Sequence, residues 1–186
     1  MKATKGRIAP LKLRIVALMI DYVVILGYGL ILWGASFLFK PVLTALFTAS
    51  AATAEITGAI LITLPITLYF ILCESSRHMG SIGKRKMGLA VTNDSGERIR
   101  FRRSLTRTII KFIPWELAHF AIWRLRMPSH FSDTFLLAIL IGVNIMVLLY
   151  IYMPVLNKDR KSLYDWIAGT LVISISTKPK SGRDSF

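Results

Sequence analysis

The stretch that decides the fold is "RIVALMIDYVVILGYGLILWGASFLFK", residues 14–40, which is apolar over a length sufficient to cross a lipid bilayer. The hydrocarbon core of a bilayer requires about 20 consecutive apolar residues in helical form. A soluble helix would show a polar face here, whereas the interior of this stretch carries a single charged residue, Asp21, and begins at Arg14. The stretch therefore predicts a transmembrane helix that retains a buried carboxylate.

The composition of the whole chain supports a membrane protein. Hydrophobic residues make up 54% of the sequence, the mean hydropathy is +0.55, and 24 Lys and Arg stand against 10 Asp and Glu. This combination is typical of a small integral membrane protein whose inner loops face anionic lipids. We therefore expect a lipid bilayer with anionic lipids at its cytoplasmic face as the partner, and no nucleic acid. The single Cys73 excludes a disulfide framework.

Three further apolar or amphipathic segments follow the first. We expect helices to span the membrane at residues 15–39, 56–73 and 134–155, which are almost wholly apolar. The segment 109–125 is more polar, and hydropathy alone favours an amphipathic helix at the membrane surface. The sequence thus allows an all-α membrane protein with a four-span helical bundle, or alternatively three spans plus an interfacial helix.

The distribution of basic residues favours four spans. Lys and Arg gather before the first span, in the loop 74–107 and after the last span, whereas residues 41–55 contain none. Loops rich in Lys and Arg remain in the cytoplasm. Four spans place every basic segment and both termini on the cytoplasmic side, whereas three spans would place the basic tail outside.

The cytoplasmic segments contain signals of a small β-hairpin or sheet. The stretch "GLAVTNDSGERIRF", residues 88–101, has two short strand-like runs around a turn cluster, and "GTLVISIS", residues 169–176, is a third strand candidate. Ser104 is expected to cap the helix that follows. Residues 1–176 are expected to form one transmembrane domain, with residues 1–9 and the basic segment 177–186 as flexible tails.

Three motifs occur in a characteristic order along the chain. Arg14 is followed seven residues later by Asp21, "SIGKRKMGLAV" covers residues 81–91 after the second span, and "KSLYDWIAGTLVI" covers residues 161–173 after the last span. Their order and position resemble the RDD family of bacterial membrane proteins, which is named for one arginine and two aspartates.

This resemblance implies roles for particular residues. The family's arginine and two aspartates would be Arg14, Asp21 and Asp165, and Gly83–Lys84–Arg85 would form its cytoplasmic basic motif. The resemblance also implies a multi-pass location in the bacterial inner membrane and a role in transport, since some members of the family are linked to sodium/proton exchange.

The two charged residues of the first span are not expected to pair with each other directly. Arg14 and Asp21 lie two helical turns apart on nearly the same face, which separates them by about 10 Å along the axis. Asp21 is expected either to bind polar groups or a basic residue of other segments and lock the bundle, or to handle a proton or cation. Asp165 is predicted to pair with Arg14 or with Lys84–Arg85.

Glu116 and His119 form a second candidate site. They lie three residues apart, on one face of a helix, and a carboxylate next to an imidazole can take up and pass on a proton near neutral pH. If the segment lies in the interface, both side chains would instead meet water or lipid headgroups.

The sequence contains no enzymatic motif, and its three histidines are scattered. We therefore expect no enzymatic activity, no cofactor and no metal site. The expected function is transport of a proton or small cation, with Asp21 as first candidate and a homo-oligomer needed to line a pore. The alternative is a non-transporting membrane subunit or scaffold that binds a partner protein or anionic lipid at the cytoplasmic face.

Overall fold

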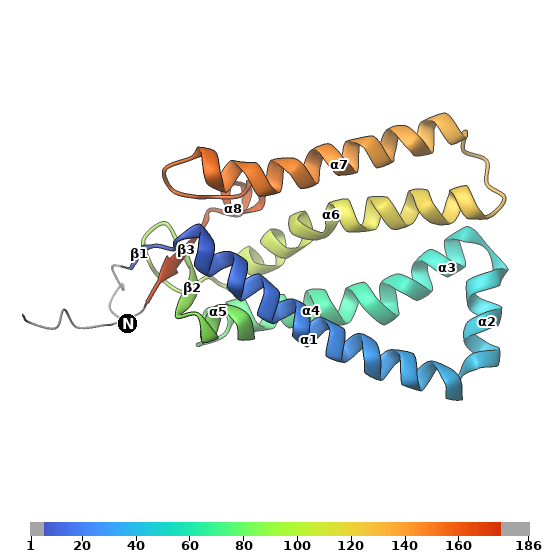
Figure 1. Cartoon of the computed structure of the whole chain (residues 1–186), viewed down its shortest axis with the longest axis horizontal. Helices are drawn as coiled ribbons and strands as arrows, with labels where there is room; N and C mark the ends of the chain where they lie inside the picture. Colours follow the sequence, from blue (N-terminus) through green and yellow to red (C-terminus); the bar gives the residue numbers. More distant parts are fainter. Residues whose placement is uncertain (1–5, 176–186) are drawn as a thin grey trace, which may run out of the picture.

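The computed structural model describes residues 6–175, which form a bundle of long helices with a small antiparallel sheet at one end (Figure 1). The predicted tail at residues 177–186 lies outside the described residues. The helices are α1 (Leu11–Leu38), α2 (Lys40–Ala49), α3 (Ala51–Gly58), the π-helical turn η1 (Ala59–Thr63), α4 (Leu64–Ser75), α5 (Ile82–Lys86), α6 (Phe101–Arg126), α7 (Asp133–Leu156) and α8 (Leu163–Ala168). The strands are β1 (Arg7–Ile8), β2 (Leu89–Asn93) and β3 (Thr170–Ser174).

Three helical stretches among the described residues are long and apolar enough to cross a membrane. They are α1, the continuous run Ala51–Ser75 that joins α3, η1 and α4, and α7. Large apolar side chains are exposed along all three, as expected where a helix faces lipid instead of water. The three apolar spans predicted from the sequence are thus confirmed as long helices, although the second begins at Ala51, ahead of the predicted residue 56.

The fourth long helix, α6, lies in the middle of the bundle, between α7 on one side and α3 and α4 on the other (Figure 1). It begins at Phe101, earlier than the sequence predicted. The expectation that Ser104 caps this helix is therefore wrong, because Arg100 occupies the cap position. The Ser104 hydroxyl lies one turn inside the helix and donates a hydrogen bond of 2.9 Å to the Ile71 carbonyl of α4.

A proline in α4 is matched by a tyrosine of α1. Pro65 has no N–H group, so the carbonyl of Leu61, four residues earlier, loses its usual helical donor. The Tyr28 hydroxyl donates to this carbonyl at 2.5 Å. The helix is π-helical directly before the proline, in η1. One neutral hydrogen bond thus attaches α1 to η1 at Tyr28, away from the sheet.

The same arrangement occurs between α6 and α7. Pro114 cannot donate to the carbonyl of Ile110, and the hydroxyl of Tyr150 in α7 donates to it at 2.6 Å. A buried carbonyl group that has lost its helical donor needs a hydrogen bond from another group. The tyrosine therefore satisfies the group that the proline frees and fixes the rotation of α7 against α6.

The sheet has the strand order β1–β3–β2, with both pairs antiparallel. Strands β2 and β3 confirm two of the three predicted strand runs. The third run, residues 97–101, is not a strand: only Arg98 bridges to Thr92, and the chain enters α6 at once. The expectation that residues 1–9 are a flexible tail is wrong for its last part, because β1 pairs with the free edge of β3 and Ala9 is fully buried.

The sheet, α5 and α8 together form what we term the sheet end of the bundle. A small apolar core lies there, built by side chains from α1, the sheet and the segment before α6: Ala9, Ala17, Leu89, Val91, Ile99 and Val172. This core holds the start of α1 against the sheet, and the charged residues described next lie beside it.

Candidate functional site

Asp21 is buried and holds the start of α5 against α1. Its carboxylate accepts hydrogen bonds from the Ser81 hydroxyl at 2.5 Å, the Gly83 N–H at 2.8 Å and the Tyr69 hydroxyl at 2.9 Å. The Tyr69 hydroxyl in turn accepts from the N–H of Ile82 at 2.9 Å. All of these donors are neutral, and they come from α4, from the loop after it and from the start of α5. Of the partners expected for Asp21 on other segments, the polar groups are confirmed: its carboxylate binds neutral donors and no basic side chain among the described residues.

Gly83 is required by the close approach of α5 to α1. A Cβ atom at this position would lie 2.0 Å from the carbonyl oxygen of Ala17 and 2.9 Å from Cγ of Asp21. Such distances are far shorter than van der Waals contact, so any larger residue would push the two helices apart. The glycine of the "SIGK" segment therefore allows the backbone of α5 to reach the Asp21 carboxylate.

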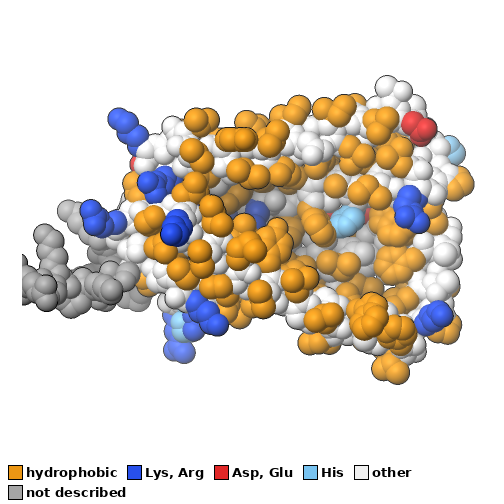
Figure 2. Space-filling model, viewed as in Figure 1, with side chains coloured by type: hydrophobic (Ala, Val, Ile, Leu, Met, Phe, Trp, Pro, Cys, Tyr) orange, Lys and Arg blue, Asp and Glu red, His pale blue; other side chains and the backbone are white. Residues whose placement is uncertain are grey.

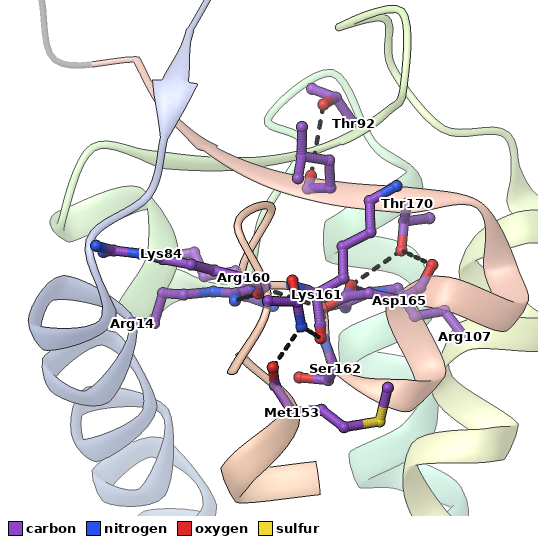
Figure 3. A network of polar contacts seen from close by, with 12 residues as sticks. Arg14, Lys84, Thr92, Arg107, Met153, Arg160, Lys161, Ser162, Asp165 and Thr170 are labelled. Carbon is purple, nitrogen blue, oxygen red and sulfur yellow. Dashed lines mark hydrogen bonds and ion pairs between the residues drawn. The ribbon is translucent and has the colours of Figure 1, made fainter. Parts of the chain in front are cut away.

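Asp165 occupies the first turn of α8 and is also fully buried (Figure 3). One carboxylate oxygen accepts from Nε of Arg107 at 2.9 Å and from the Thr170 hydroxyl at 3.0 Å. The other accepts from Arg14 at 3.2 Å and from the N–H of Ser162 at 3.2 Å. Burial alone would raise the pKa of Asp165, but the two guanidinium groups lower it below its ordinary value. The ionised carboxylate thus ties α1 and α6 to α8.

Arg107 extends this network to a second buried carboxylate. Besides contacting Asp165, it forms an ion pair with Glu74 at the end of α4, and Lys84 of α5 pairs with the same carboxylate. Burial lowers the pKa of Lys84, although Glu74 opposes this shift. We refer to Arg14, Asp165, Arg107, Glu74 and Lys84 as the charge cluster, in which each carboxylate lies between two cations.

The structure brings some predicted site residues together and leaves others apart. Arg14, Asp165 and Lys84 meet in the charge cluster, and Asp21 lies beside it, across α5. Arg85 is exposed at the surface of α5. Sequence reasoning missed two central members, Glu74 and Arg107. Both are charged residues next to predicted spans, at residues 56–73 and 109–125, and this signal could have drawn attention to them.

Glu116 and His119 form a separate pair midway along α6. Nδ1 of His119 lies 3.9 Å from the Glu116 carboxylate, so the expected proximity is confirmed. The ring of Trp115 packs edge-on against His119, with 4.7 Å between the ring centroids, and its N–H donates to the Thr63 hydroxyl at 3.1 Å. Within residues 6–175, Oε1 of Glu116 is buried without a hydrogen-bond partner. The same residues contain no group of three side chains suited to holding a metal ion.

Three apolar helices and a buried charge cluster at one end define a small helical membrane protein whose distant segments are tied together by ion pairs. The sequence profile of the RDD family matches residues 8–169, and the chain belongs to this family of membrane proteins. The matched range contains the whole charge cluster and both Asp21 and Gly83. No curated protein and no solved structure matches the chain.

Proposed function

We propose that the protein transports a proton or small cation across the bacterial inner membrane, with Glu116 as the residue that binds it. The observation that carries this proposal is the buried Oε1 atom of Glu116, which has no hydrogen-bond partner within residues 6–175. An unpaired carboxylate oxygen in a helix bundle is costly. A proton or a small cation would complete it, and His119 at 3.9 Å is placed to exchange a proton with it.

Transport along this route requires α6 to cross the membrane, which makes the bundle four-spanning. With 26 residues, α6 is about 39 Å long, enough for the hydrocarbon core. An interfacial helix lies in the plane of the membrane, roughly across the spans, whereas α6 runs alongside α7 and α4 (Figure 1). These features support a crossing helix.

The same topology assigns the sheet end and both termini to the cytoplasm. Lys and Arg side chains gather at the sheet end on the face shown in Figure 2, and basic segments remain inside. Reporter fusions test this assignment: a reporter inserted after Pro128 is expected outside the cell and one fused after Phe186 inside. A cytoplasmic reporter at Pro128 would contradict the four-span topology.

The geometry gives Asp21 a positioning role in this proposal. Asp21 was the first candidate in the sequence, but three protein donors already occupy its carboxylate. Its contacts support a fixed joint between α1 and α5. Because a bundle of only four long helices offers little room for a pore, we further propose that the transporting unit is a homo-oligomer.

Flux measurements in liposomes test the function. The full chain is reconstituted with a pH-sensitive dye inside, and Na⁺, K⁺ or proton gradients are imposed. Glu116→Gln preserves size but cannot exchange a proton, so it is expected to abolish flux, whereas Glu97→Gln, at an exposed turn, should leave it unchanged.

Two outcomes would contradict the proposal. Full flux in Glu116→Gln would remove this residue from the route. A wild-type protein that moves no ion under any gradient would favour the other class of function, a non-transporting subunit that binds a partner protein or anionic lipid.

A further inference from the structure

A furrow runs along the bundle between α1 and α7. It consists of two adjoining cavities of about 230 and 340 Å³, and four residues line both: Leu18, Phe70, Lys111 and Tyr150. Figure 2 shows this face hollowed between the two helices, with a Lys or Arg side chain at the bottom of the hollow. The furrow is open at the side, toward the region that lipid would occupy around the apolar helices.

The cavity nearer the sheet is lined by four cations, namely Arg14, Lys84, Arg107 and Lys111, and by the carboxylate of Asp21. The three buried carboxylates of this region are already engaged. Asp165 and Glu74 bind the cations of the charge cluster, and Asp21 binds α5. Four cations and three carboxylates leave one positive charge in excess.

Lys111 is the cation of this cavity that is left without a carboxylate partner among the described residues. Within residues 6–175 it forms no ion pair; its ammonium group lies 3.4 Å from the ring centroid of Phe70 and 5.5 Å from that of Phe112. Aromatic rings compensate an ammonium group only partly. Lys111 also lies at the junction of the two cavities, so an anion beside it would be in contact with both.

The apolar walls of the two cavities indicate the chemistry of the rest of the molecule that carries the anion. The second cavity contains no charged side chain besides Lys111, and its walls include Ile25, Ile66, Val143 and Val147. The outer rims of the first cavity are apolar and exposed, at Ile15 on α1 and Ile151 on α7. Such a furrow matches a molecule with one negative charge and a long hydrocarbon chain that enters sideways from the bilayer.

We propose that the furrow binds one anionic phospholipid. Its phosphodiester would lie beside Lys111 and Arg14, and an acyl chain would follow the second cavity between α1 and α7. This proposal concerns a site different from Glu116 and is independent of ion transport. It differs from ordinary attraction of lipids to a basic surface, because it requires one buried cation and one enclosed chain.

Native mass spectrometry of the full chain in detergent tests the proposal, with phosphatidylglycerol, phosphatidylethanolamine and inorganic phosphate as probes. We expect one phosphatidylglycerol retained per chain, little phosphatidylethanolamine at the same concentration, and no displacement by phosphate. Lys111→Gln should weaken phosphatidylglycerol binding by at least about five-fold. The matched control is Lys86→Gln, an exposed position of α5, which should bind as the wild type does.

A second pair of variants tests the chain-binding part without altering charge. Leu18→Trp places a large side chain where the two cavities join and should abolish retention of the lipid. Val23→Trp, on the exposed side of α1, should not. This pair also decides the matter if Lys111→Gln fails to fold.

Several results would overturn the proposal. Equal retention of the two lipids, or unchanged binding in both Lys111→Gln and Leu18→Trp, would exclude a specific lipid site. Displacement of phosphatidylglycerol by inorganic phosphate would indicate a site for a free anion. A dimer that is lost in Leu18→Trp would show that a second copy of the chain occupies the furrow.

Discussion

The sheet end and the middle of the bundle surround their carboxylates in different ways: Asp165 and Asp21 are buried whole, whereas the Glu116 side chain is 37% exposed and only its Oε1 atom is buried. At the sheet end, Asp165 accepts four hydrogen bonds and Asp21 accepts three, all from groups of the protein. In the middle of α6, Glu116 has a buried oxygen without a partner among the described residues. Burial of a charge therefore does not by itself mark a functional site. The carboxylates with complete sets of donors hold the architecture, and the incomplete one is the better candidate for function.

The two regions also differ in what joins the helices. The sheet end combines segments far apart in the sequence, since Arg14 and Asp165 are 151 residues apart. In the middle, α1 and α7 are attached to their neighbours by hydrogen bonds from Tyr28 and Tyr150. Substitutions at the sheet end should therefore cost much more stability than substitutions in the middle, and the following predictions test this difference.

The largest effect is expected for Arg107→Gln. Arg107 binds both Glu74 and Asp165, so its loss leaves two buried carboxylates without their shared cation. Breaking a buried ion pair in this way costs about 3–5 kcal/mol. Equilibrium unfolding in detergent mixed with SDS measures the free energy of unfolding. Arg103→Gln, exposed one turn earlier on α6, is the control and should change it by less than about 0.5 kcal/mol.

Gly83→Ala should have the next largest effect. The added Cβ would meet the carbonyl oxygen of Ala17, a backbone atom that cannot move without shifting α1. We expect a loss of about 3 kcal/mol, at the upper end for overpacking. Gly142→Ala in α7 has open space around its Cβ and should be neutral or stabilising by up to about 1 kcal/mol. Equal stability of the two variants would contradict the close approach of α5 to α1.

Much of this fold could be predicted from local patterns. Long apolar runs mark α1, the run ending at α4, and α7, and the turn after Asn93 marks the end of β2. Two features could not be predicted in this way. Strand β1 has only two residues, too few to show alternation, and residues 97–101 make a single bridge to β2 before the chain enters α6, so no strand pattern marks where that helix begins.

The candidate site was predictable only where the partners flank the membrane segments. The pairing of Arg14 with Asp165 was one of two foreseen, the other being with Lys84–Arg85, because all of these residues lie just outside apolar runs on the same predicted side. The pairing of Arg107 with Glu74 was not foreseen, because it depends on the relative rotation of α4 and α6. The donors to Asp21 include a backbone N–H at Gly83, and no side-chain pattern reports such a group.

Acid should weaken the sheet end through Asp165. Its pKa in the folded protein is lowered from the ordinary value of 3.8, because Arg107 and Arg14 stabilise the ionised form. Its contribution to stability is therefore complete above pH 3.8 and is lost as the pH falls through the lower, folded-state pKa. Unfolding measured between pH 5 and pH 2 should show this loss in the wild type.

Replacing Asp165 by Asn shows how much of the pH dependence of the unfolding free energy comes from this carboxylate. Asp165→Asn should be less stable near neutral pH but should lose less stability on acidification, because it has no proton to bind at this position. Asp159→Asn, exposed in the loop before α8, is the matched control and should retain the acid dependence of the wild type. An identical slope in Asp165→Asn and the wild type would show that Asp165 does not contribute to it.

The smallest effect is expected in the middle of the bundle, for Tyr150→Phe. This change removes the donor to the carbonyl of Ile110, a single neutral hydrogen bond between α7 and α6. Hydrogen bonds between membrane helices contribute about 0.6 kcal/mol on average and about 1.7 kcal/mol at most. Because Pro114 leaves that carbonyl without a helical donor, we expect a loss of about 1 kcal/mol, near the middle of this range.

The control for this change lies on the same helix. Tyr152 is exposed, and Tyr152→Phe should leave the free energy of unfolding unchanged. Tyr150→Phe should also retain the acid dependence of the wild type, since the bond that it removes involves no ionisable partner. A loss as large as that of Arg107→Gln would mean that the middle of the bundle depends on its interhelical bonds as strongly as the sheet end depends on its ion pairs. The incomplete donor set of Glu116 would then no longer distinguish a loosely held functional region from a rigid one.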